Sequence, residues 1–364
     1  MSSISIDKSV AMGLKDLLGY LLDSDKVDSV LTMRRIPETG AWDLALITDS
    51  GNLGEAEPLA PVMTVNAGKE LSSLSLSGKR IAAVLKPCEL RALIERVKRE
   101  QGSLQNLLTI SHTCSGVFPL EQAADGSMNE LLPKYEKVAS MGEVPSSVRD
   151  TCKACQHFIP VHPDIMLASA GAQRPGEGCV LYLEGGKAEE ALREFRGVRD
   201  DRVFDPSSLD RTAAARKKER DRLFARVEND CSGLDGLLNV FGKCVGCHGC
   251  SRVCPICYCA LCDFESMNFD YNLPYFEEHL SRRGALRLPP DTVMFHLGRL
   301  THMSFSCVGC GMCSDVCPVG IPVAAVFSRT GERTASLFDY VPGRSLTEEI
   351  PVMVFKEEEF SELG

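Results

Sequence analysis

The sequence predicts an α/β or α+β domain at the N-terminus and a mostly α-helical domain, organised by cysteines, at the C-terminus. Short apolar runs alternate with amphipathic segments over residues 1–185. Eleven of the 17 cysteines lie between Cys244 and Cys317, and a densely charged stretch precedes them. We therefore divide the chain into an N-terminal domain, a charged helical linker, a cysteine-rich domain and a C-terminal tail: residues 1–185, 186–230, 231–335 and 336–364.

The expected elements follow from local patterns. Residues 9–22 carry apolar side chains at helical spacing and predict a helix. The charges of residues 211–226 predict a solvated helix in the linker, and the tail is expected to be a loosely packed extension with an acidic end. Short apolar runs predict strands near 27–33, 42–48, 81–85 and 180–183, with helices from about 89 to 100 and from about 188.

The composition excludes several classes of protein. A formal net charge of −10 argues against nucleic-acid binding. The N-terminal apolar stretch is interrupted by charges such as Asp7 and Lys15, so it does not predict a signal peptide. No window approaches the ~20 apolar residues that span a bilayer. We expect a cytoplasmic protein without a transmembrane segment, in which 17 thiols indicate metal ligation more than disulfides.

Two cysteine runs have the same spacing. The first runs from Cys244 to Pro255 and the second from Cys307 to Pro318, and both read C-x2-C-x2-C-x3-C-P. This is the bacterial ferredoxin pattern, in which the fourth cysteine ligates the other 4Fe–4S cluster. Zinc, the alternative, takes two cysteine pairs and has no use for the third and fourth cysteines. We therefore expect a dicluster ferredoxin-like domain with a first set of ligands (Cys244, Cys247, Cys250, Cys317) and a second set (Cys307, Cys310, Cys313, Cys254).

The insert between the two runs carries further candidates. His296, Arg299 and His302 lie in a segment of helical spacing before Cys307. They are candidate hydrogen-bond donors to cluster sulfurs, and the alternative is ordinary packing or surface roles. Three more cysteines could ligate an additional cluster, with Cys231 or another residue as fourth ligand, or could be unligated thiols: Cys257, Cys259 and Cys262. Outside that alternative, Cys231 is expected to be a packing residue, as is Cys179.

One cysteine of the N-terminal domain lies where a strand should lead into a helix. Cys88 follows Lys86 and Pro87 directly after the apolar run 81–85. The first turn of a helix favours a thiolate through its unpaired N–H groups and its dipole. A reactive or ligating thiolate is therefore one reading of Cys88, and a buried structural cysteine is the other.

The stretch from Lys86 to Leu93 (Lys-Pro-Cys-Glu-Leu-Arg-Ala-Leu) resembles the β subunits of coenzyme F(420)-dependent hydrogenases and formate dehydrogenases. The resemblance spans about residues 10–200 and continues at Cys114 and at the Cys152-x2-Cys155 pair. It implies that a third set (Cys88, Cys114, Cys152, Cys155) holds a 4Fe–4S cluster beside an FAD whose contacts the sequence does not identify. From spacing alone, Cys152 and Cys155 could equally be half of a zinc site. No G-x-G-x-x-G motif predicts a Rossmann site.

The resemblance of the N-terminal domain, together with the two ferredoxin motifs that follow it in the same chain, implies an electron-transfer subunit of an anaerobic oxidoreductase complex. The expected partners are hydrogenase, formate dehydrogenase or heterodisulfide reductase-like subunits, and the expected route leads from a hydride carrier or catalytic subunit to further redox partners. A flavin-free 4Fe–4S wire without its own substrate is the first alternative, and a zinc-bound interaction module is the second. Catalytic residues are not identified by the sequence.

Overall fold

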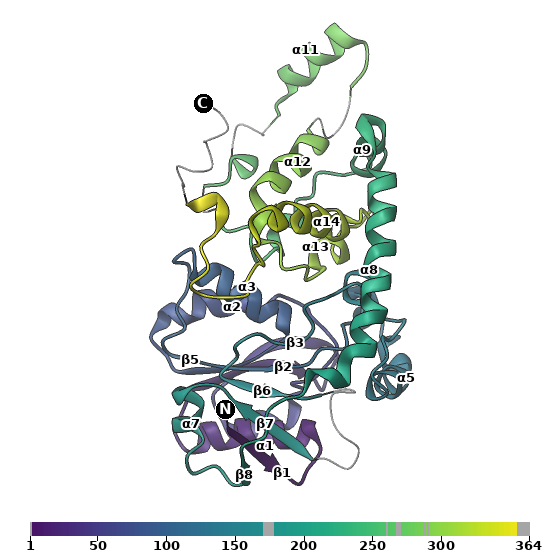
Figure 1. Ribbon diagram of the computed structural model, residues 1–364. Helices are drawn as coiled ribbons and strands as arrows, with labels where there is room; N and C mark the ends of the chain where they lie inside the picture. Colours follow the sequence, from purple (N-terminus) through teal and green to yellow (C-terminus); the bar gives the residue numbers. More distant parts are fainter. Residues whose placement is uncertain are drawn as a thin grey trace, which may run out of the picture.

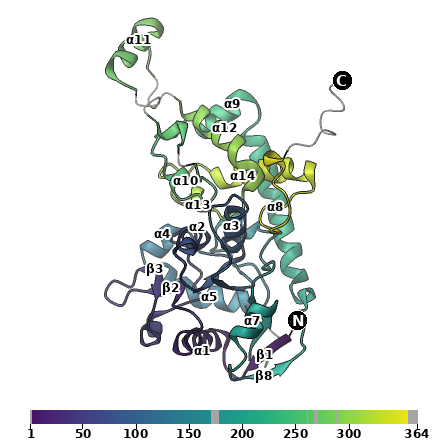
Figure 2. The same ribbon diagram turned by 90° about the vertical axis from the view of Figure 1, so that its left-hand side faces the viewer.

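The computed structural model describes residues 2–169, 178–259, 261–266, 271–286, 289 and 291–354. Figure 1 shows a sheet domain below, a helical domain above, and one long helix that runs along the side of both. In Figure 2, helix α11 projects away from the body of the molecule. The strands are β1 (Ser2–Ile6), β2 (Ser29–Arg35), β3 (Trp42–Ile47), β4 (Ile81–Leu85), β5 (Leu107–His112), β6 (Ile165–Leu167), β7 (Cys179–Leu183) and β8 (Val198–Asp200).

The helices divide between the two parts of the molecule. Those of the sheet domain are α1 (Val10–Asp23), α2 (Ala67–Leu74), α3 (Pro87–Val97), α4 (Leu120–Ala124), α5 (Met128–Ser140), α6 (Asp150–Lys153) and α7 (Gly186–Ala191). The connecting helix is α8 (Asp210–Asp230), and the helical domain holds α9 (Gly233–Phe241), α10 (Gly249–Arg252), α11 (Leu273–Arg283), α12 (Thr292–Met303), α13 (Met312–Asp315) and α14 (Val323–Ala335).

The eight strands of the described residues form one mixed sheet in the order β3-β2-β4-β5-β6-β7-β1-β8. The central strands β2, β4, β5 and β6 are parallel, and the flanking pairs are antiparallel. All five residues of β4 are buried, as expected for a parallel strand that is covered on both faces. The carboxyl ends of β4 and β5 therefore lie side by side, and loops that leave them can share one site.

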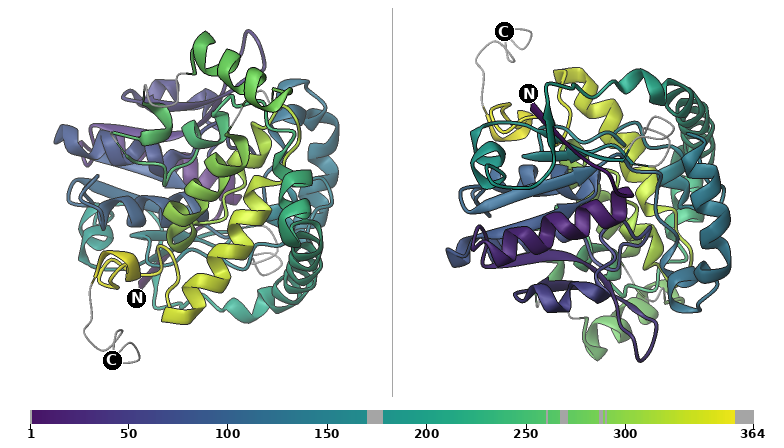
Figure 3. Two further views of the ribbon diagram at one scale, coloured as in Figure 1. Left: turned by 90° about the horizontal axis from the view of Figure 1, so that it is seen from above. Right: turned by 90° about the horizontal axis from the view of Figure 1, so that it is seen from below.

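Helices cover both faces of this sheet. The apolar side of α1, including Leu14, Leu17 and Leu21, packs on one face with strand residues such as Val30 and Ile110, and the view from below in Figure 3 shows α1 against the sheet. On the other face, α2 and α3 pack on alternate residues of the same strands. Each burial of a large apolar side chain contributes about 1.5–3 kcal/mol.

The predicted fold class is confirmed, with a difference at the linker. The apolar run 81–85 is β4, the helix expected over 9–22 is α1, and the charged helix is α8. However, α7 and β8 lie inside the stretch expected to be linker, and β8 pairs with β1 through residues 3–5. The sheet therefore extends to Asp200, because β8 supplies hydrogen bonds to one edge of β1.

Helix α3 docks the helical domain onto the sheet domain. Its guanidinium groups donate hydrogen bonds to backbone carbonyls across the interface: Arg91 Nε to Pro342 O at 2.7 Å and Arg96 Nη1 to Pro255 O at 2.9 Å. Arg99 also donates to the Ser306 hydroxyl. Because Arg91 is only 3% exposed, its bond forms in a water-poor interface, where a lost partner is costly.

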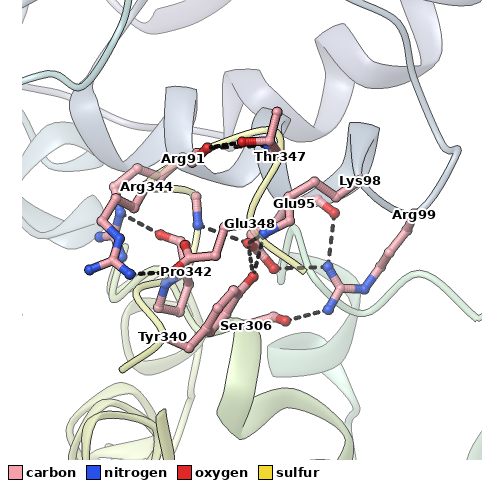
Figure 4. Close-up of polar contacts among 12 residues, drawn as sticks. Arg91, Glu95, Lys98, Arg99, Ser306, Tyr340, Pro342, Arg344, Thr347 and Glu348 are labelled. Carbon is pink, nitrogen blue, oxygen red and sulfur yellow. Dashed lines mark hydrogen bonds and ion pairs between the residues drawn. The ribbon is translucent and has the colours of Figure 1, made fainter. Parts of the chain in front are cut away.

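The start of the tail packs instead of hanging free, which corrects the expectation of a loose extension. Tyr340 and Ile350 are buried, and the Glu95 carboxylate of α3 accepts hydrogen bonds from the Tyr340 hydroxyl and from the Gly343 N–H at 2.8 Å. Figure 4 shows this network. Burial would raise the pKa of Glu95, but the donors Tyr340 and Arg99 outweigh burial and lower it. The acidic end, residues 357–359, lies outside the described residues.

We expect Tyr340→Phe to lower the free energy of unfolding by about 1–2 kcal/mol, because the buried Glu95 carboxylate loses one donor. Urea denaturation followed by circular dichroism measures the change. Tyr275→Phe on α11, outside this interface, is the matched control and should leave stability unchanged. Equal stability of both variants would contradict the role given to Tyr340.

Candidate metal centres

The two ferredoxin runs fold in the same way. Gly246 and Gly309 have φ values of 66° and 69°, and Gly311 has 85°. Each run then enters a one-turn helix, α10 or α13. The sequence repeat is therefore a structural repeat, and the glycines permit the left-handed turns that the loops need.

One position of the repeat differs in a way that the structure explains. Gly311 cannot carry a side chain, because an added Cβ would lie 2.5 Å from Thr151 Oγ1. The equivalent position of the first run is His248, with φ 54°. Its ring stacks on Phe295 with centroids 4.2 Å apart, and its Nδ1 lies 3.0 Å from Glu265. These contacts offset the cost of a left-handed residue, about 1–2 kcal/mol.

The second set of cysteines gathers around one cavity. Cys254 of the first run and the three leading cysteines of the second run line one small cavity, together with Arg299 and Met303. The crossing of the fourth cysteine, expected from the ferredoxin pattern, is the arrangement that brings these thiols together. The assignment of each as an iron ligand stays a prediction.

The first set lies beside it. The charge of Cys250 interacts with those of the other three members, Cys244, Cys247 and Cys317. Two backbone N–H groups point at these sulfurs: Gly246 N lies 3.4 Å from Cys244 Sγ and Ile321 N lies 3.3 Å from Cys317 Sγ. Such N–H donors stabilise negative charge on cluster sulfurs and tune the potential.

The third set lines a second small cavity at the carboxyl ends of β4 and β5. Cys88 begins α3 after β4, Cys114 follows β5, and Cys152 and Cys155 come from α6 and the residues after it. The Gly116 N–H donates to Cys114 Sγ at 3.4 Å. The topology thus brings together four thiols from a stretch of chain in which the first and the last, Cys88 and Cys155, are 67 positions apart.

Burial controls the protonation of these thiols. It raises the pKa of Cys88 well above its ordinary value, with Glu89 adding to the effect, although Cys88 lies in the first turn of α3. It also raises the pKa of Cys310 and Cys152 to about 11. The expected thiolate at Cys88 is therefore not favoured by the helix alone. A bound metal must supply the positive charge, and its binding releases protons.

The three sets follow one another in space. Cys310 lines the cavity of the second set and also that of the third set. Cys313 of the second set lies close enough to Cys250 of the first set for their charges to interact. The second set is therefore the middle member of a series of three.

The three predicted donors from α12 lie in different surroundings. Arg299, 3% exposed, donates from Nη1 to Cys250 Sγ at 3.1 Å and from Nη2 to the Cys250 carbonyl at 3.1 Å. His296 is 2% exposed and stacks on Phe241 with centroids 4.5 Å apart. His302 lines a different, outer cavity. Arg299 thus donates to a cysteine sulfur, and the assignment of that sulfur to a cluster stays a prediction.

Sequence reasoning missed two further arginines. Arg149, 4% exposed, donates to the Cys310 and Met63 carbonyls at 3.2 Å each and pairs with Asp315. Arg216 of α8, 1% exposed, donates to the Cys114 carbonyl at 2.9 Å. Arg149 directly precedes the Asp150-Thr-Cys152 segment. This position is the only feature of the sequence that could have marked it as a residue of the site. Arg216 belongs to the charged run that predicts a solvated helix, so the sequence did not distinguish it from its exposed neighbours.

The remaining cysteines lie in three different places. Cys257, Cys259 and Cys262 line the outer cavity near α12. Cys231 lines another cavity, between α8 and α14, and the structure does not bring it to these three. Cys179 is buried in the sheet, where a Cβ on Gly13 would lie 2.6 Å from its Cβ. Cys179 is therefore a packing residue, as predicted.

The buried ring of His296 makes stability depend on pH. Burial, then Arg299 and His248, lower its pKa from 6.5 to about 4. The unfolded chain binds a proton below about pH 6.5 that the folded chain does not bind, so stability is full above that pH and falls toward pH 4. When the pH is lowered from 7.5 to 5.5, the free energy of unfolding should fall in the wild type by about 1 kcal/mol more than in His296→Phe, which lacks the titrating ring.

Urea denaturation at the two pH values measures this difference. Met294→Leu, at a 65% exposed position of the same helix, should keep the wild-type dependence. An unchanged pH dependence in His296→Phe would show that another group is responsible.

Comparisons with known proteins agree with this geometry. Residues 243–321 match the 4Fe–4S dicluster domain family. The F(420)-dependent formate dehydrogenase subunit beta of Methanocaldococcus jannaschii is 26% identical over 359 residues, which cover 90% of each chain. The F(420)-dependent formate dehydrogenase 1 subunit beta of Methanococcus maripaludis is 28% identical over 371 residues, which cover 90% of this chain and 89% of the relative.

Among solved structures, a chain of the F(420)-reducing [NiFe] hydrogenase complex from Methanosarcina barkeri matches with a TM-score of 0.43 and 14% identity, over 64% of this chain and 92% of that chain. Within the described residues, no helix is both long enough and apolar enough to cross a membrane. In the same residues, no three His, Cys, Asp or Glu side chains are gathered as closely as one metal ion requires.

The repeated loops and the dicluster match define an iron–sulfur protein with two 4Fe–4S clusters in its C-terminal part. A mixed eight-stranded sheet domain precedes that part. Over about 90% of its length the chain is similar to the β subunits of F(420)-dependent formate dehydrogenases.

Proposed function

We propose that this chain is the electron-transfer subunit of a cytoplasmic, anaerobic formate dehydrogenase or hydrogenase complex that uses coenzyme F(420). Three cubane clusters, held by the first, second and third sets, would pass single electrons, and a flavin would exchange electron pairs as hydride with the soluble carrier. The observation that carries this proposal is the series of three cysteine sets, with Cys310 on the wall of two cavities. Catalysis of formate or hydrogen oxidation would belong to a partner subunit.

The cavities of the second and third sets fit cubanes chemically. Four thiols are the ligand number that a cubane takes. Each cavity also has one buried arginine in its wall, Arg299 in the second and Arg216 in the third. Within the described part of the chain, the Nε atoms of both arginines have no hydrogen-bond partner. Cluster sulfur can accept such bonds, and the cations offset the negative charge of the ligated thiolates.

A neighbouring cavity suits a flavin. It is bounded by Cys155 of the third set and Cys307 of the second set, so a ring bound there would lie next to both. Arg91, His157 and Arg220 also line it, and cationic side chains bind the phosphates of a dinucleotide. The apolar walls include Leu223 and Phe224 of α8, which would exclude water from the ring. We assign the flavin to this cavity.

Cys310→Ser should remove one cluster from the middle of the series. Serine oxygen is a poorer ligand for iron than thiolate, so we expect the loss of about four irons per chain and a fall of at least about tenfold in electron transfer from reduced carrier to dye, about 1.4 kcal/mol or more in the barrier. Iron analysis, EPR and the dye assay measure these changes. Cys179→Ser, the packing cysteine, is the control. Full iron and full transfer in Cys310→Ser would contradict the series.

Arg220→Glu should release the flavin. The reversed charge repels phosphate in the proposed cavity, so flavin fluorescence after denaturation of the variant should fall at least about fivefold, about 1 kcal/mol in binding. Arg222→Glu on the same helix is the matched control, because Arg222 points to solvent with a side chain 70% exposed. A wild-type protein with full iron and no flavin would favour the flavin-free wire.

A further inference from the structure

Three cysteines remain outside the three sets and outside the packed core. Cys259 is exposed, Cys257 and Cys262 are half-buried, and Leu261 between them is 98% exposed. Cysteines that serve packing are usually among the most buried residues. Three thiols crowded on an open loop are also prone to oxidation. Their exposure argues against a packing role.

These thiols face a common cavity. Cys257, Cys259 and Cys262 line it, and so does His302 of α12. The Phe264 and Phe295 rings, with centroids 5.4 Å apart, belong to the same cavity. Soft thiolates, an imidazole and an apolar lining form a donor set suited to iron and sulfide.

We propose that Cys257, Cys259, Cys262 and His302 hold a fourth 4Fe–4S cluster at the outer side of the second set. On binding, each cysteine forms an Fe–S bond and releases its thiol proton to water, and a neutral imidazole nitrogen completes the ligands. Histidine replaces cysteine on iron in some iron–sulfur centres. The site does not depend on a flavin or on the identity of the partner subunit.

His302 is the better fourth ligand of the two that the cavity offers. Glu265 also lines it, but its carboxylate is engaged: it lies 3.0 Å from His248 Nδ1 and 3.9 Å from Arg252 Nη2. His302 comes from the facing helix α12, so it would join the loop to the domain. The segment from Pro255 to Cys262 has no helix or strand in its described residues, and ligation would fix it.

The position of Cys257 favours an electron-carrying centre over zinc. Its thiol is hydrogen-bonded to that of Cys254, a member of the second set, and its Sγ lies 3.6 Å from Met303 Sδ. The charge of Arg299 interacts with three cysteines, and each belongs to a different site: Cys250, Cys254 and Cys257. One buried cation thus serves three adjoining sites, as required where several anionic clusters meet. The fourth cluster would lead electrons from the second set to the exposed loop.

The test is iron and sulfide analysis of the anaerobically purified full-length chain. Relative to wild type, Cys259→Ser/Cys262→Ser should lose about four irons and about four sulfides per chain, with the EPR signals of the other clusters retained. His302→Ala should show the same loss and His302→Cys should prevent it, since a thiolate replaces the imidazole. Cys231→Ser is the matched control and should retain all iron.

Three results would overturn the proposal. Unchanged iron in both the double variant and His302→Ala would leave the loop without a cluster. Loss of about one zinc with unchanged iron would make the site a zinc site. A wild-type chain with no more than about 12 irons would have room for only three cubanes, whatever the variants did. Because Cys310→Ser tests the middle of the series separately, failure here would leave the proposed function standing.

Discussion

The arrangement of the metal centres depends on α3. Its first turn carries Cys88 of the third set, and its guanidinium groups bind carbonyls of the loops that hold the other sets, as Arg91 binds Val308 O at 3.3 Å. One rigid helix therefore fixes the sheet-domain site against the ferredoxin-like loops. Electron carriers need such fixed separations, because a site that is loosely supported loses its working geometry. The buried Glu95 and the start of the tail brace the same helix.

Buried arginines supply positive charge beside the cysteine loops. Arg91, Arg149, Arg216 and Arg299 are each less than 5% exposed, and burial of an unpaired cation would cost several kcal/mol. Three of them donate to a carbonyl of a cysteine, as Arg216 does to Cys114 O. The protein thus places cations beside thiols whose pKa values burial raises. Such an interior favours the ligated form, in which iron and arginine together balance the thiolate charge.

Much of this account could be predicted from the sequence, because its signals are local. The C-x2-C-x2-C-x3-C-P spacing and the apolar run of β4 are local patterns. The third set was predicted from the resemblance of the Lys-Pro-Cys-Glu stretch to a known family. What the sequence concealed depends on contacts between distant segments. Tyr340 looked like part of a loose tail because its partner, Glu95, is 245 positions away. Arg216 looked solvated because nothing in a charged run marks the one side chain that turns inward. The linker prediction ended the sheet too early, since β8 is only three residues long and gains its stability from β1.

The most direct test of the central claim is an anomalous diffraction map of anaerobically grown crystals, recorded at the iron absorption edge. The account predicts strong iron peaks in series, with one between Cys88 and Cys152, a middle one beside Cys310 and Cys254, and one beside Cys244 and Cys317. A map with no iron at the middle position, or with no iron at the other two cysteine sets, would contradict it.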